Sequence, residues 1–137
     1  VIGLIPGPFG AYYGASKHAI EGYSASPDHE VRPFGSPVAV IEPWATKTSI
    51  EANSPQGDRP VAAYAQTLAR YRTAFDAAMA TGDTAEDVAA TVLAAARDRR
   101  PRLRYPSGKA AKQTAFARRF LPRSVFDRTL RKQFNIA

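Results

Sequence analysis

Residues 10–24 read GAYYGASKHAIEGYS, and this stretch decides the fold. No run of β-branched residues interrupts it, and small or aromatic side chains recur three or four positions apart, at Ala15, Ala19, Tyr23 and Ser26. The spacing predicts a helix over residues 11–32. Pro27 lies inside that helix and removes one of its hydrogen bonds, so we expect a kink or an early break there.

A second informative stretch is the apolar run at residues 38–41, which stops at Glu42. Such a run is typical of a strand buried on both faces, as in a parallel sheet covered by helices. Thr84 and Asp87 are spaced as a capping box at a helix start. The alternation of strands and helices predicts an α/β fold. The other predicted elements are a β-like end at 1–5, a loop at 52–60, helices at 61–79, 85–97, 109–120 and 124–133, and a strand at 102–105 that ends before Pro106.

Charge is unevenly distributed along the chain. The net charge is +7, but the residues from Arg97 onward contain 13 Lys and Arg against two acidic residues, whereas residues 1–96 contain 6 basic and 10 acidic groups. In the last predicted helix Phe126, Leu130 and Phe134 recur every fourth position. We therefore expect the two tail helices to place Phe and Leu opposite Lys and Arg. No nucleic-acid-binding motif accompanies the charge, so we expect no nucleic-acid partner.

Several classes of protein are disfavoured by composition. The absence of cysteine excludes a disulfide framework, a thiolate metal site and a cysteine nucleophile. His18 and His29 have no partner at metal-ligand spacing, so we expect no metal centre. The apolar stretches fall far short of the ~18 residues of a membrane span, and the start does not resemble a signal peptide. The chain opens in mid-pattern at Val1 without Met, and we expect it to be N-terminally truncated.

Tyr13 and Lys17 are the candidate catalytic residues. Residues four apart lie on the same face of a helix, one turn from each other. A lysine ammonium within several ångströms of a phenol favours the phenolate, so such a tyrosine can act as a general acid or base nearer to neutral pH. The pattern Tyr-x-x-x-Lys also arises by chance in many helices, where it is an ordinary surface pair.

The residues around Tyr13 and Lys17 favour a catalytic pair over a chance surface pair. Residues 10–24 closely resemble the active-site helix of short-chain dehydrogenases/reductases, residues 29–35 (HEVRPFG) resemble the end of that helix, and residues 38–43 (VAVIEP) resemble the strand that follows. The three segments stand in the family's order. The resemblance is strong over residues 1–48, and the remainder is similar, more loosely, to the C-terminal region of hydroxysteroid- and retinol-dehydrogenase-like members.

The resemblance implies the roles of the site residues. Tyr13 would exchange a proton with the substrate oxygen, and Lys17 would favour its phenolate and bind the ribose of the nicotinamide cofactor, NAD or NADP. The loop after the strand would face the nicotinamide. Pro43 opens this loop, and Thr48 occupies the position of the family's threonine that contacts the nicotinamide carboxamide. Trp44 and Thr46, which lie between them, are further candidate cofactor-binding residues, as is Tyr13. Tyr12 is the competing tyrosine, but only Tyr13 has a lysine four positions later.

The chain departs from the family pattern at several positions. The family's catalytic serine would precede Val1, and its catalytic asparagine and Gly-rich phosphate turn lie further upstream, so this chain contains none of them. Trp44 stands where the family nearly always has Gly, which permits a close approach of the cofactor. Pro27 and Ser36 stand where apolar residues are usual. These departures are typical of a degenerate copy.

We therefore predict the C-terminal part of a Rossmann-type, doubly wound parallel sheet at residues 1–108, with a basic amphipathic helical tail at 109–137. The predicted function is NAD(P)-dependent oxidation of a small-molecule alcohol or reduction of a carbonyl compound. A lipophilic substrate is implied only at the family level. The alternative is an inactive remnant whose tail binds a membrane surface or a protein partner. We expect a cytoplasmic protein, membrane-peripheral if the tail binds lipid, and a homo-oligomer when intact.

Overall fold

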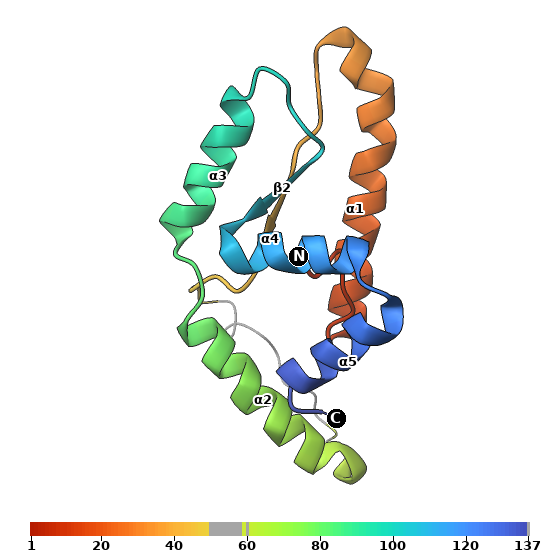
Figure 1. The fold of residues 1–137 in the computed structure, drawn as a ribbon, viewed down its shortest axis with the longest axis vertical. Coiled ribbons are helices and arrows are strands. Elements are labelled where there is room, and N and C mark those ends of the chain that lie inside the picture. Colours follow the sequence, from red (N-terminus) through yellow and green to blue (C-terminus); the bar gives the residue numbers. More distant parts are fainter. Residues whose placement is uncertain (50–58, 60, 137) are drawn as a thin grey trace.

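The computed structural model describes residues 1–49, 59 and 61–136. Figure 1 shows the two strands between α3 and α1, with α4 lying across the middle of the view and α2 and α5 below it. Among the described residues, no helix combines the length and apolar character needed to cross a membrane. The elements follow the order α1 (Ala11–Val31), η1 (Arg32–Phe34), β1 (Val40–Pro43), η2 (Ala62–Tyr64), α2 (Ala65–Ala80), α3 (Ala85–Arg97), β2 (Arg104–Ser107), α4 (Gly108–Phe120) and α5 (Arg123–Gln133).

The two strands form a parallel sheet, in which Val40 pairs with Arg104 and Pro43 pairs with Ser107. The connection between them contains α2 and α3, and α3 packs back against both strands. Parallel strands need such a crossover, so β1, α3 and β2 form a βαβ unit. This arrangement confirms the predicted α/β class, and it is consistent with part of a Rossmann-like fold.

Both strands lie two residues later than predicted. Pro106 belongs to β2 and pairs with Glu42 instead of ending the strand. Within the described residues β2 pairs along one edge only, and proline is tolerated on an edge strand where its missing N–H faces away from the partner. Residues 1–5 form a turn closed by a hydrogen bond from the N–H of Leu4 to the carbonyl of Val1, so the predicted β-like end is wrong.

The prediction that the first strand is buried on both faces is also wrong for the described part of the chain. Glu42 is the buried residue of β1, and its apolar neighbours Val40 and Ile41 are only half-buried. A sheet of two strands offers helices little width to cover, which leaves both faces partly open. The loop predicted at 52–60 lies outside the described residues except for Arg59.

The helices follow the sequence pattern closely. α3 spans the predicted residues, and its capping box is formed, because the N–H of Asp87 donates to Thr84 Oγ1 (3.2 Å) while the N–H of Thr84 donates to Asp87 Oδ2 (2.9 Å). α1 continues through Pro27 to Val31, so the early break is wrong. Asp28 stabilises this last turn, since its carboxylate accepts hydrogen bonds from Arg32 and from the N–H of Val38.

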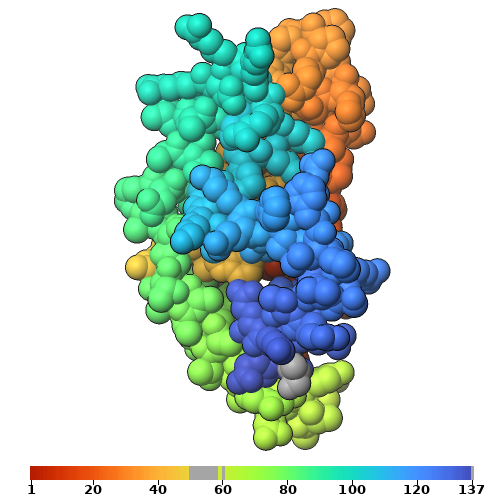
Figure 2. All heavy atoms as spheres, viewed as in Figure 1, coloured from red at the N-terminus to blue at the C-terminus, as the bar shows by residue number. Residues whose placement is uncertain are grey.

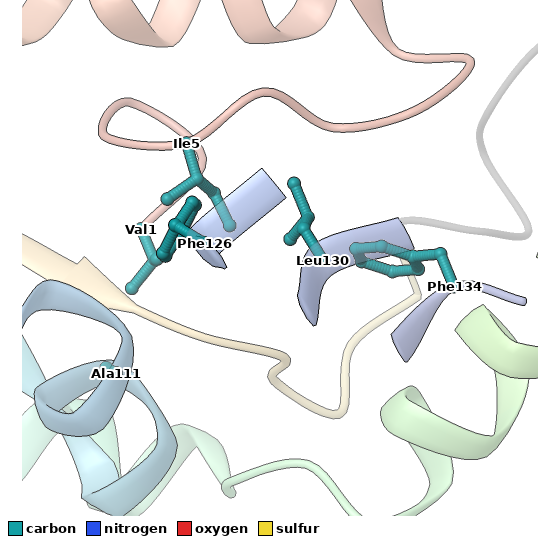
Figure 3. Close-up of a cluster of buried hydrophobic side chains, with 6 residues drawn as sticks. All are labelled: Val1, Ile5, Ala111, Phe126, Leu130 and Phe134. Carbon is teal, nitrogen blue, oxygen red and sulfur yellow. The ribbon is translucent and has the colours of Figure 1, made fainter. Parts of the chain in front are cut away.

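A buried apolar cluster joins the N-terminal turn to the C-terminal helices (Figure 3). The stripe of Phe126, Leu130 and Phe134 predicted from the sequence is buried in it, at 5–8% exposure. Half-buried Trp44, Tyr71 and Phe75 pack around this cluster. The members of the cluster are Val1, Ile5, Ala111, Phe126, Leu130 and Phe134.

Helix α4 does not follow the predicted amphipathic arrangement. Its inward face carries small residues, with Ala111 fully buried and Ala117 packed against the cluster. Its large apolar residues, Phe116 and Phe120, are 65% and 62% exposed. The expectation that Phe and Leu lie opposite the basic residues therefore holds for α5 and is wrong for α4. Alanine lets a helix approach its neighbours closely, which explains why the small face packs inward.

Truncation of two phenylalanines tests whether the core contains the apolar face of α5 and excludes the large apolar residues of α4. Phe126→Ala removes a buried ring and should lower the free energy of unfolding by about 3–5 kcal/mol, because a cavity is left in the core. Phe116→Ala, the matched control at an exposed position, should change it by less than about 0.5 kcal/mol. Urea denaturation followed by circular dichroism measures both, and equal losses would contradict the assigned core.

Candidate active site

The first turns of α1 bring Tyr13 and Lys17 together. The Lys17 Nζ atom lies 5.2 Å from the centroid of the Tyr13 ring, within the range of a cation–π contact. Tyr13 is 49% exposed, whereas its neighbour Tyr12 is 95% exposed. An ammonium group therefore lies close to one of the two adjacent tyrosines, and that phenol remains accessible to a small molecule.

The N-terminal turn connects this pair to the end of β1. A Cβ atom on Gly3 would lie 2.9 Å from the carbonyl oxygen of Lys17 and 2.6 Å from Glu21 Cγ, so glycine permits the close approach of this turn to α1. On its other side, the amino group of Val1 donates a hydrogen bond to the carbonyl of Pro43 (2.9 Å). The turn thus links the helix of Tyr13 and Lys17 to the loop that follows β1.

That loop is fixed by the segment before α3. The N–H of Lys47 donates to the carbonyl of Asp83 (3.0 Å), and the N–H of Asp83 donates to the carbonyl of Ala45 (2.9 Å). Thr46 lies between these two bonds, and its Oγ1 atom is buried without a hydrogen-bond partner among the described residues. Thr48 is exposed. The loop therefore offers one unsatisfied buried hydroxyl and one solvent-accessible hydroxyl.

Trp44 lies at the start of the same loop and is half-buried against the apolar cluster. It lines a cavity of about 300 Å³ between the loop and the C-terminal helices. The remaining lining residues come from α4, α5 and the link between them, and include Thr114, Leu121, Phe126 and Thr129. The indole therefore contributes to the contact between the loop and the tail.

Sequence reasoning missed a group of buried charges behind this site. Glu21 of α1 and Glu42 of β1 are 8% and 1% exposed, and Arg104 of β2 lies between them. Its Nε atom is 3.0 Å from Glu21 Oε2 and 3.5 Å from Glu42 Oε1. The position of Glu42 at the end of an apolar run, and of Glu21 one turn after Lys17, was the available signal. Nothing in the sequence indicated that both would pair with Arg104, which lies far along the chain.

Glu42 is the most deeply buried residue of this group. Neither of its carboxylate oxygens has a hydrogen-bond partner among the described residues. Burial, reinforced by the negative charge of Glu21, raises the pKa of Glu42 to about 7, although the amino group of Val1 and Arg104 act in the opposite direction. The carboxyl of Glu42 therefore changes protonation close to neutral pH.

Comparison with known proteins points to one class of enzyme. Distant curated relatives over most of the chain are oxidoreductases of the short-chain dehydrogenase/reductase family. No family model matches the chain. The uncharacterized oxidoreductase YusZ of Bacillus subtilis is 33% identical over 97% of this chain and 49% of its own length. The probable short-chain type dehydrogenase/reductase VdlC of Helicobacter pylori is 26% identical over 96% of this chain and 49% of its own length.

A vertebrate relative shows the same partial coverage. Dehydrogenase/reductase SDR family member 7B of Xenopus tropicalis is 35% identical over 75% of this chain and 30% of its own length. The chain thus spans about half the length, or less, of the curated relatives it matches. It is related to oxidoreductases of this family, and it corresponds to only part of them.

The raised pKa of Glu42 predicts how stability depends on pH. Because the folded-state value, about 7, exceeds the unfolded value of 4.5, the folded protein holds this proton more tightly, and stability contributed by the neutral form is lost as the pH rises from 4.5 through 7. Glu42→Gln should flatten this loss and raise the melting temperature at pH 8. Thermal unfolding across this pH range measures it. The exposed control Glu30→Gln should leave the wild-type profile, and an unchanged profile in Glu42→Gln would refute the assignment.

Proposed function

We propose that this chain is the C-terminal, catalytic part of a short-chain dehydrogenase/reductase that interconverts an alcohol and a carbonyl compound with NAD or NADP. The observation that carries the proposal is the accessible Tyr13 beside the Lys17 ammonium, 5.2 Å from its ring. The related oxidoreductases support the class of reaction. The related proteins do not identify the substrate.

In the proposed reaction Tyr13 is the acid–base group. For carbonyl reduction its hydroxyl donates a proton to the substrate oxygen, and for alcohol oxidation its phenolate accepts the proton. Lys17 would keep a positive charge beside the Tyr13 ring while the proton is transferred. When bound, the nicotinamide cofactor supplies or accepts the hydride, and the protein's contribution is orientation and electrostatics.

The loop after β1 is the proposed contact for the nicotinamide. A carboxamide has both donors and acceptors, and the buried, unsatisfied Thr46 Oγ1 is a hydroxyl that can pair with either. Thr48 adds an accessible hydroxyl. Pro43 and Trp44 form the backbone at the start of the loop, and Lys17 would bind the ribose. The Trp44 indole packs against the buried apolar cluster and lines the cavity beside the C-terminal helices.

The phosphate-binding part of such an enzyme belongs to its N-terminal half. Within the described residues the second edge of β1 carries no strand, and the amino group of Val1 is bonded at the end of that edge. We propose that this edge pairs with a further parallel strand of that half. Open strand edges bind other strands readily because their backbone groups are unpaired.

Two adjacent tyrosines allow a matched test of the proposed function in the complete protein that contains this chain. Tyr13→Phe removes only the hydroxyl and should lower kcat at least about 100-fold, because general acid–base catalysis is lost. Tyr12→Phe should leave kcat near the wild-type value. The assay follows NADH and NADPH absorbance with a panel of aldehydes, ketones and alcohols, and cofactor binding is measured separately by fluorescence.

Cofactor binding and turnover, measured together, distinguish a catalytic role of Tyr13 from a role in binding the cofactor. Cofactor binding retained by Tyr13→Phe with lost turnover would support the assigned role. Turnover that is equally sensitive to Tyr12→Phe, or unaffected by Tyr13→Phe, would refute it. A complete protein that binds neither dinucleotide would contradict the proposed class.

A further inference from the structure

We propose that the exposed face of α4, with the start of α5, is a docking surface for membranes that carry anionic lipid headgroups. This proposal is independent of the catalytic one, because it involves none of the candidate active-site residues. Figure 2 shows the atoms of α4 and α5, in blue, as a continuous surface across the front of the molecule.

The apolar part of this surface consists of four exposed side chains between residues 116 and 125. The rings of Phe116 and Phe120 are in contact, with centroids 4.6 Å apart, and they are 65% and 62% exposed. Leu121 in the link to α5 and Val125 in the first turn of α5 are 42% and 45% exposed. We call these residues, Phe116, Phe120, Leu121 and Val125, the apolar patch. Four large apolar side chains close together in the sequence remain in water although smaller ones are buried.

Basic residues share the helix face of the apolar patch. Lys109, Lys112 and Arg119 lie seven positions before, four before and three after Phe116, so all three fall on its side of α4. All are exposed, and the Arg119 guanidinium lies 5.6 Å from the Phe120 ring. Arg123 continues the series with a side chain that is 88% exposed. Cations and apolar groups are therefore mixed on one accessible face.

This combination matches the interfacial region of an anionic membrane. A helix lying in that region inserts apolar side chains below the headgroups, while Lys and Arg reach the phosphates. Attraction comes from the tail, residues 109–137, which contains eight basic residues and one acidic residue. The earlier part has the opposite balance, with 6 basic and 10 acidic residues in positions 1–96. The molecule would thus approach such a membrane with its α4–α5 side.

The apolar patch favours lipid over nucleic acid as the occupant. Proteins that bind single strands use separated aromatic rings, on which successive bases stack. Here the two rings contact each other, and their neighbours Leu121 and Val125 are aliphatic and have no π-face for a base. Aliphatic and aromatic side chains can both enter the acyl boundary of a bilayer.

Vesicle sedimentation of the 137-residue chain tests the proposal. The probes are vesicles of phosphatidylcholine alone and of phosphatidylcholine with phosphatidylglycerol. The chain should bind the anionic vesicles, release at high salt and bind the neutral ones weakly. Phe116→Ser/Phe120→Ser should lower the partition coefficient at least about tenfold, because the two rings proposed to enter the membrane are lost. Lys112→Gln/Arg119→Gln should lower it about tenfold or more on anionic vesicles only.

Matched controls remove comparable side chains elsewhere. Tyr23→Ser/Phe34→Ser changes two aromatics that are 78% and 84% exposed on α1 and η1, and Arg99→Gln/Arg100→Gln changes two exposed cations outside α4 and α5. Both should bind nearly as the wild type does, and circular dichroism verifies that every variant is folded.

Each other result would overturn the proposal. Equal binding by the α4 variants and their controls would show that the apolar patch is not the contact. Equal binding to neutral and anionic vesicles would show that the headgroup charge does not contribute to binding. Fluorescence anisotropy with a single-stranded oligonucleotide is the competing measurement. Tighter binding to the oligonucleotide than to the anionic vesicles, lost in the same α4 variants, would identify nucleic acid as the occupant.

Discussion

The arrangement of the site depends on Arg104, which lies between two buried carboxylates. Its Nε atom is 3.0 Å from Glu21 Oε2 and 3.5 Å from Glu42 Oε1, so one guanidinium links α1, β1 and β2. Without that positive charge the carboxyl groups of Glu21 and Glu42 would repel each other in a poorly hydrated environment, and α1 would lose its ion pair with β2. The orientation of α1 relative to the sheet therefore depends on a residue at the far end of the crossover.

This link matters because α1 carries Tyr13 and Lys17. Glu21 lies one turn beyond Lys17, and Gly3 allows the N-terminal turn to pack against the same two turns of the helix. The pair itself is local in sequence, but its position relative to the loop after β1 is set by contacts from three separate elements. The proposed lipid contact uses residues of α4 and α5 that are not among the candidate active-site residues, so variants can test it and the proposed chemistry separately.

The sequence predicts those features that local patterns determine. The capping box at Thr84 and the stripe of Phe126, Leu130 and Phe134 define α3 and the buried face of α5, because both signals lie within one or two helical turns. Strand positions were wrong by two residues, since a short apolar run does not define the register of a parallel pair. The contact of Arg104 with Glu21 joins residues 83 positions apart, and no local pattern marks it. On α4 the rule that large apolar residues face inward failed, because alanines could pack more closely.

The most direct test of this account is a double-mutant cycle between Glu21 and Arg104, measured as the free energy of unfolding of Glu21→Gln, Arg104→Gln and the double variant. The account predicts a coupling of at least about 1 kcal/mol, as expected for a partly buried, charge-assisted hydrogen bond. The exposed pair Arg123–Asp127, with side chains 88% and 39% exposed, is the reference and should show less than about 0.5 kcal/mol. A coupling between Glu21 and Arg104 no larger than that of the reference pair would contradict the central role assigned to Arg104.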